Sequence, residues 1–203
     1  YVKEAKMEDL SDVCYIGGST HQLATCKIGE DKYYLKFSDS YAFSNPTDKS
    51  MQIGVEYLAY KIYQLYPANV PQGVEVVSDP QQKRIGLATA EMKGQPAGDL
   101  RHSFSGQAGE IKTMMDPNMR GGAGWLLSQV DMRKACEAFL AVSWSQVQQA
   151  IMVALGEVSR ELKNAGLQDQ MIAWQDEVKQ IMTKLETRHA DVKDHCEHTL
   201  SEM

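Results

Sequence analysis

The first third of the chain alternates short runs of β-branched and aromatic residues with polar turns. The runs at 13–16, 22–28 and 33–37 are rich in strand-forming residues, and glycine or charged residues separate them. The segment at 29–32 reads Gly-Glu-Asp-Lys, which is typical of a hairpin turn. This pattern predicts three consecutive antiparallel strands.

The spacing of apolar residues then changes to that of a helix. A helix is predicted from near Ser50, after a polar loop, and Pro67 ends it. Its apolar face comprises Val55, Leu58, Ala59, Ile62, Leu65 and Tyr66. Two further strand-like runs follow at 74–77 and 85–92. The predicted order of elements is therefore β-β-β-α-β-β.

The second half of the chain has a helical pattern. Glycine recurs between residues 96 and 124, where periodicity fades, and this predicts a connector. Ser143 and Gln146 have the spacing of a capping box at the start of a helix that Gly166 ends. The last helix carries a seam of residues spaced by threes and fours, namely Met171, Trp174, Val178, Ile181, Leu185, His189, Val192, Cys196 and Leu200.

The predicted fold class is α+β. An antiparallel five-stranded sheet with one packed helix is followed by an all-α helical hairpin or three-helix bundle. The predicted divisions are a sheet-containing domain at 1–95, a glycine-rich connector at 96–124 and a helical bundle at 125–203. The seam of the last helix fits two arrangements. It packs inside the chain, or it forms an oligomer or partner interface that Trp174 would anchor.

Composition narrows the classes of function. The net charge of -6 and the sequence pI near 5.4 argue against binding to nucleic-acid phosphates. No segment approaches the roughly 18 apolar residues that a membrane helix requires, so no integral membrane segment is expected. The cysteines lie far apart at Cys14, Cys26, Cys136 and Cys196, with no C-x-x-C pair. Reduced thiols and a cytoplasmic location are therefore expected.

Several short motifs of the first domain occur in an order known from one superfamily. They are the loop Gly17, Gly18, Ser19, Thr20; Lys36 in the third strand; Glu56 in the helix; Val70 and Pro71 before the fourth strand; and Glu91 and Met92 at the end of the fifth. In this order they resemble the small, ATP-binding lobe of the protein-kinase-like superfamily. The resemblance covers residues 12–95 and is to the atypical branch of HipA-type toxin kinases, phosphoinositide kinases and bacterial effector kinases.

The resemblance implies a role for each motif. Backbone N–H groups and hydroxyls of the 17–20 loop would hold phosphate oxygens. Lys36 would neutralise phosphate charge, and Glu56 would hold the lysine in place by an ion pair. The backbone at Glu91 and Met92 would be the hinge that binds adenine. The implied cofactors are ATP and magnesium.

Each motif also fits a plainer interpretation. The loop lacks the fuller G-x-G-x-x-G pattern and fits an ordinary hairpin or bulge. Lys36 fits an edge-strand lysine that discourages aggregation. Glu56 fits a solvated helix residue.

A kinase-like enzyme also needs a catalytic aspartate. The best match is 189–196, His-Ala-Asp-Val-Lys-Asp-His-Cys, which is similar to the family's H-x-D-x-K-x-x-N loop and places Asp191 at the catalytic base. Cys196 stands where the family has asparagine, and the helical pattern continues through the segment. Asp191, His195 and His198 share one side of the predicted helix, so a two- or three-ligand surface metal site is geometrically possible. The same residues fit a solvated polar helix end, and no metal site is predicted.

Three hypotheses of function follow, and the third is an independent α+β adaptor whose likeness to a kinase lobe is coincidental. The first is a kinase-like ATP-binding protein, which if active would be a phosphotransferase acting on protein or lipid hydroxyls. The alternative is a non-catalytic, pseudokinase-like interaction module. The expected partners are a nucleotide and a protein, or a second copy of the chain, bound through residues 171–200. The atypical branch also suggests a bacterial effector acting in a host cytosol.

Overall fold

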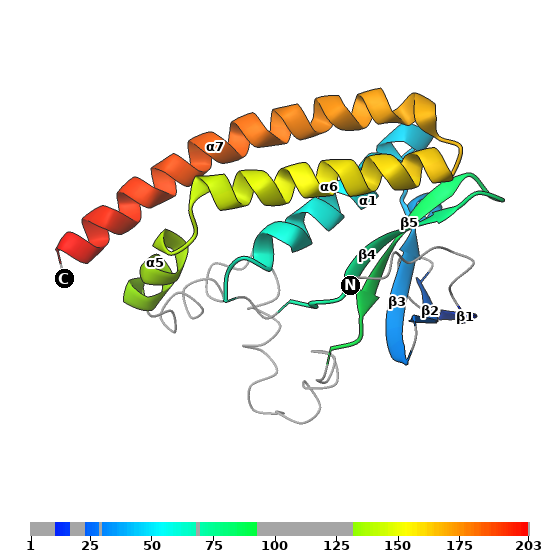
Figure 1. Ribbon diagram of the computed structural model, residues 1–203, viewed down its shortest axis with the longest axis horizontal. Coiled ribbons are helices and arrows are strands. Elements are labelled where there is room, and N and C mark those ends of the chain that lie inside the picture. The colour runs from blue at the N-terminus through cyan, green and yellow to red at the C-terminus, as the bar shows by residue number, and fades with distance from the viewer. Residues whose placement is uncertain (1–10, 17–22, 29, 68–69, 93–131, 203) are drawn as a thin grey trace.

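The computed structural model describes residues 11–16, 23–28, 30–67, 70–92 and 132–202 of the chain. These residues form an α+β fold, as predicted, in which helices lie along one side of an antiparallel sheet (Figure 1). The strands are β1 (Ser11–Ile16), β2 (Leu23–Ile28), β3 (Asp31–Phe37), β4 (Val74–Asp79) and β5 (Arg84–Ala90). They form a five-stranded sheet in the order β1-β2-β3-β5-β4, which places β3 at the centre.

The register of the strands separates the sheet into two faces. Lys36 pairs with Leu87, and Leu87 pairs with Val76, so these three positions share the face that carries the helices. The opposite face has a cluster of its own, formed by Ala24, Cys26, Tyr33, Leu35, Phe37, Val77 and Ala88. Lys36 therefore stands between the buried residues Leu35 and Phe37 in the sequence, because these two residues point to the face opposite the helices.

The first helix, α1 (Pro46–Tyr63), is longer at its start than its apolar pattern indicates. The Asn45 side chain accepts a hydrogen bond from the backbone N–H of Thr47 at 2.9 Å, and Pro46 occupies the first turn. Both are favourable at a helix N-terminus. Asn45 and Pro46, which were predicted to lie in a loop, are thus the N-cap and the first residue of α1. The predicted helix start near Ser50 is wrong by about one turn.

The C-terminal half is helical. Its helices are α5 (Met132–Leu140), α6 (Trp144–Asn164) and α7 (Met171–Ser201), and short 3₁₀ turns lie at Ser38–Ser40 and Gln168–Gln170. The predicted capping box of Ser143 and Gln146 is confirmed at the start of α6. After α6 the chain reverses at Gly166, whose positive φ of 76° favours glycine. Among the described helices, none is long and apolar enough by itself to cross a membrane.

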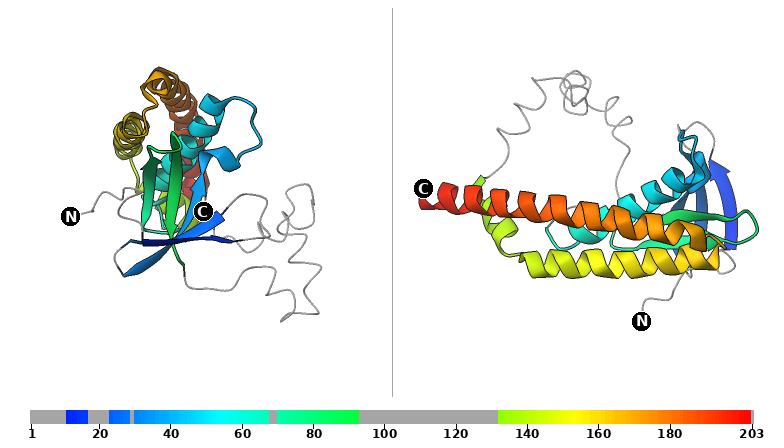
Figure 2. Two further views of the ribbon diagram at one scale, coloured as in Figure 1. Left: turned by 90° about the vertical axis from the view of Figure 1, so that its right-hand side faces the viewer. Right: turned by 90° about the horizontal axis from the view of Figure 1, so that it is seen from above.

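One hydrophobic core joins the sheet and the helices. Its buried residues include Ile53 of α1, Val76 of β4, Leu87 of β5, Ile151 of α6 and Trp174 of α7. Helices α6 and α7 lie side by side, and α6 also packs against α1 (Figures 1 and 2). The helical half therefore buries its apolar face against residues of the predicted first domain.

Trp174 is at the centre of this core. Its side chain is 0% exposed, and its indole N–H donates to the carbonyl of Leu155 at 3.2 Å. The alternative in which Trp174 anchors a partner is wrong, because the ring is enclosed by this chain's own helices.

A comparison of two helical glycines tests how tightly this core is packed. A Cβ on Gly54 would lie 2.6 Å from Cζ3 of the buried Trp174 ring, whereas a Cβ on Gly156 would meet nothing within 4 Å. We expect Gly54→Ala to lower the free energy of unfolding by about 1–3 kcal/mol through overpacking. Gly156→Ala should raise it by about 0.5–1 kcal/mol because alanine favours a helix. Urea denaturation of both variants measures the difference, and equal effects would contradict the close contact.

The state of the cysteines differs from expectation. Cys136 of α5 and Cys196 of α7 form a disulfide across 60 positions of sequence, with their Cα atoms 5.0 Å apart. The expectation of reduced thiols is wrong for this pair, because packing of α5 on α7 brings the two residues together. The cysteine argument for a cytoplasmic location therefore no longer applies. Cys26 is a free, buried thiol, and burial raises its pKa to about 11.

Candidate functional site

An ion pair links the centre of the sheet to the first helix. Nζ of Lys36 on β3 lies 2.6 Å from Oε2 of Glu56 on α1, and the two side chains are 20% and 27% exposed. Both partners are thus largely withdrawn from water, where an ion pair is less screened than at an open surface. The pair that the resemblance implied is present.

Tyr41 holds both members of this pair. Its hydroxyl donates a hydrogen bond to Oε1 of Glu56, and Nζ of Lys36 lies 5.0 Å from the centre of its ring. Burial, followed by the hydrogen bond to Glu56 and the charge of that carboxylate, raises the pKa of the Tyr41 hydroxyl. Tyr41 therefore remains a neutral hydrogen-bond donor that orients Glu56 toward Lys36.

A row of polar residues continues from Lys36 across the same face of the sheet. Thr25 pairs with Tyr34 and Tyr34 pairs with Thr89, so the row crosses β2, β3 and β5 two positions along from Lys36. All three side chains are half-buried. The helix-facing side of the sheet is therefore apolar at Val76 and Leu87, beside Lys36, and polar along the row that runs through Thr25, Tyr34 and Thr89.

The predicted hinge lies at the far end of this face. The Glu91 carboxylate accepts hydrogen bonds from Lys32 at 3.2 Å and from the hydroxyl of Tyr34 at 3.1 Å. These bonds lower the pKa of Glu91, and the hydrogen bond to Glu91 raises that of Lys32. The backbone N–H of Glu91 donates to the carbonyl of Lys32 at 2.9 Å. The backbone N–H of Glu91 is therefore already used within the sheet.

The spacing between these two positions follows from the strand. Lys32 and Lys36 are four residues apart on β3, which corresponds to about 13 Å along an extended strand. Glu91, which is hydrogen-bonded to Lys32, and the Lys36–Glu56 ion pair therefore lie at opposite ends of this face of β3.

The remaining predicted site residues are not part of this arrangement. Gly17, Gly18, Ser19 and Thr20, and the connector at 96–124, lie outside the described residues. Asp191 is exposed on α7, which is one continuous helix from Met171 to Ser201. The C-terminal part of α7 extends away from the sheet (Figures 1 and 2). The structure therefore does not bring Asp191 to Lys36.

Two features of the site were missed by the sequence interpretation. Tyr41 lies in an irregular segment after β3, and no periodic pattern distinguishes it. The polar row becomes visible only when the register of three strands is known. A signal was present in the alternation along β3, where Lys32, Tyr34 and Lys36 fall on one face.

Metal-binding side chains do not gather in the part of the chain that the structure describes. No group of three His, Cys, Asp or Glu residues there could hold a metal ion. Nε2 of His198 lies 3.1 Å from the carboxylate of Glu202, the residue that follows α7. The polar end of α7 thus has local contacts of its own.

Comparisons with known proteins complete the description of the site. The β-β-β-α-β-β order and the ion pair of Lys36 with Glu56 are present in the structure. A search of family models, of curated proteins and of solved structures finds no match for the chain.

Proposed function

We propose that residues 11–92 bind ATP on the helix-facing side of the sheet, in the manner of a kinase-like small lobe. The observation that carries this proposal is the ion pair of Lys36 with Glu56. In protein kinases, a lysine of the third strand is held by a glutamate of the following helix and contacts the phosphates. Here the two residue types occur on the corresponding elements, and the pair lies beside a polar surface.

The course of the chain supports a phosphate site next to Lys36. Leu23, the first residue of β2, pairs with Lys36, and Ile16, the last residue of β1, pairs with Leu23. Ile16 and Leu23, which precede and follow residues 17–22 in the sequence, therefore lie at the level of Lys36. The glycine and hydroxyl residues at 17–20 have the types that bind phosphate oxygens.

The proposed roles follow from these positions. Lys36 binds the phosphates, and Glu56 together with Tyr41 holds the lysine in position. The carbonyl of Glu91 and the backbone of Met92 contact the base at the other end of the face. No residue is assigned to transfer of the phosphoryl group, and Asp191 is left out because it lies on the distant part of α7.

Calorimetric titration of ATP, with and without magnesium, tests the proposal. We expect the chain to bind ATP and Lys36→Met to weaken binding by roughly tenfold or more, because a charge-assisted contact to phosphate is lost. Methionine keeps the apolar stem of the side chain. Lys83→Met, which removes the same charge from the exposed β4–β5 turn, is the matched control.

Two results would contradict this proposal. One is the absence of ATP binding by chain that circular dichroism shows to be folded. The other is an equal loss of affinity in Lys36→Met and Lys83→Met, which would indicate a general effect of charge. Either result would leave the non-catalytic interaction module as the leading hypothesis.

A further inference from the structure

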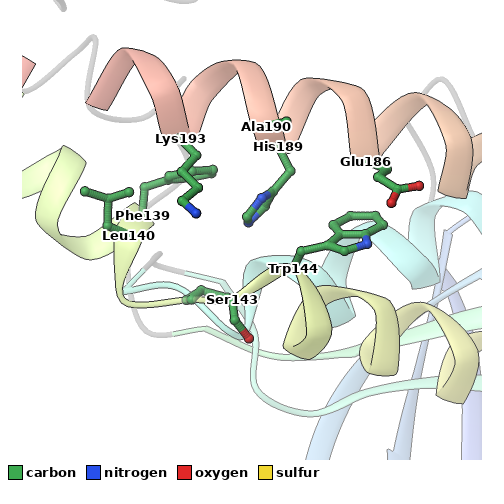
Figure 3. Close-up of a pocket in the computed structure, with 9 residues that line it drawn as sticks. Phe139, Leu140, Ser143, Trp144, Glu186, His189, Ala190 and Lys193 are labelled. Atoms are coloured by element: carbon green, nitrogen blue, oxygen red, sulfur yellow. The ribbon is translucent and has the colours of Figure 1, made fainter. Parts of the chain in front are cut away.

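A hollow is present among the helices of the C-terminal half. It is a pocket of about 400 Å³ between α7 and the corner where α5 turns into α6. Figure 3 shows the side chains of His189 and Lys193 reaching from α7 toward Phe139 and Trp144. We call this the corner pocket, and its volume is within the range of small-molecule sites.

Aromatic rings form the walls of the corner pocket. The His189 ring centre is 4.9 Å from that of Phe139 and 5.6 Å from that of Trp144. A narrower, almost wholly apolar cavity of about 140 Å³ shares these three residues and continues toward Ile62 and Leu185. Flat aromatic walls of this kind favour a planar, apolar ligand.

His189 also presents a polar atom without a protein partner. Its Nε2 is buried, and among the described residues no hydrogen-bond partner for it is present. A buried polar atom in this position is unfavourable unless a ligand or water satisfies it. A ligand in the corner pocket can satisfy Nε2 once a small rotation of the His189 ring exposes that atom, which has almost no accessible surface in the arrangement shown (Figure 3).

The charges along α7 orient such a ligand. Lys193 lies at one end of the pocket, and Glu186 lies at the other end beside Trp144 (Figure 3). The ammonium group of Lys193 is 3.9 Å from the exposed Glu197 carboxylate, a loose pair that water screens. The capped N-terminus of α6 at Ser143 adds its positive dipole to the same pocket. A negative group is therefore favoured near Lys193.

We propose that the corner pocket binds a small planar aromatic carboxylate, with its ring between Phe139 and Trp144 and its carboxylate at His189 and Lys193. The Nε2–H tautomer of His189 donates one hydrogen bond to the carboxylate, and the ammonium group of Lys193 donates a second. This site is separate from the proposed ATP site and does not depend on it.

The disulfide keeps the walls of the pocket together. Cys136 is one helical turn before Phe139 on α5, and Cys196 is about one turn after Lys193 on α7. The covalent link thus holds opposite walls at a fixed separation. A preformed pocket of this kind loses less conformational freedom when it binds its ligand.

The test uses three naphthalene probes that share a ring and differ in charge. They are naphthalene carboxylate, naphthalene methanol and naphthylmethylammonium, and each is titrated into the full, oxidised chain. NMR signals of the His189 ring and the Trp144 indole report the site of binding. We expect saturable binding of the carboxylate, weaker binding of the alcohol and the weakest binding of the ammonium.

Two variants examine the assigned contacts. Lys193→Gln should weaken binding of the carboxylate by roughly tenfold and leave the alcohol unchanged, because one charge-assisted hydrogen bond is lost. His189→Phe keeps an aromatic wall, removes Nε2 and should also weaken the carboxylate selectively. Lys184→Gln removes the same charge from an exposed position of α7 outside the pocket and should have no effect.

Several outcomes would overturn this proposal. They are the absence of saturable binding by any probe, equal affinity for the three probes, and an equal effect of Lys184→Gln and Lys193→Gln. Chemical-shift changes at Met152 and Met182, which line a different hollow between α6 and α7, would assign the probe to that surface instead. Lys193 is exposed, so its variant is expected to remain folded and to give a clear answer even if His189→Phe does not.

Discussion

Replacing Trp174 by alanine is expected to lower the free energy of unfolding by about 3–5 kcal/mol. The ring is fully enclosed by the core that joins α1, α6, α7 and the sheet, and alanine would leave a large cavity there. The substitution would also leave the carbonyl of Leu155 without its hydrogen bond from the indole. Denaturation in guanidinium chloride, followed by far-ultraviolet circular dichroism, gives the free energy directly.

A neighbouring residue provides the control for this experiment. Ile172 lies on the same helix and is 69% exposed, so Ile172→Ala should change the free energy of unfolding by no more than about 0.5 kcal/mol. A loss of less than about 1 kcal/mol in Trp174→Ala would mean that the core is not assembled around this ring.

Removal of the Cys136–Cys196 disulfide is the second change with a large expected effect. The link closes a loop of about 60 residues, and its loss should lower the free energy of unfolding by about 4 kcal/mol through the greater entropy of the unfolded chain. We would measure urea denaturation of the double variant Cys136→Ala/Cys196→Ala and of the parent chain, each with and without dithiothreitol.

The reductant separates the effect of the bond from that of the side chains. Dithiothreitol should destabilise the parent chain and leave the double variant unchanged, because the variant lacks the disulfide that the described residues contain. An unchanged parent chain after complete reduction, shown by mass spectrometry of alkylated cysteines, would contradict the expected stabilisation.

Local sequence was sufficient to predict most of the helices and strands. The capping box of Ser143 and Gln146 marks the start of α6, and the turn at Gly166 marks its end, because both depend on neighbours a few residues away. The start of α1 was placed too late, since Asn45 and Pro46 are favourable both in a loop and at a helix N-terminus.

The candidate ATP site was predictable in part. Lys36 and Glu56 were identified from residue type, order and resemblance, and the structure places them in contact. Tyr41 was not identified, because its hydrogen bond to Glu56 depends on how the segment after β3 folds back over α1. The hydrogen bond from the Glu91 N–H to the carbonyl of Lys32 likewise depends on the pairing of β3 with β5.

By itself, the sequence determined the α+β class, the order of the elements and the apolar face of α6. It did not determine the buried face of α1, where Met51, Gly54 and Tyr57 are buried and only Leu58 of the predicted apolar face is. The fold class, the order of the elements and an apolar helix face depend on the spacing of residues and on interactions between near neighbours. Both can be recognised in a short stretch of sequence. Tertiary structure alone decided that Trp174 is enclosed, that Cys136 meets Cys196 and that His189 reaches a pocket shared with Phe139. Each of these depends on how helices that are far apart in sequence pack together. The spacing of apolar residues shows which face of a helix can be buried, but it does not identify the element that covers that face.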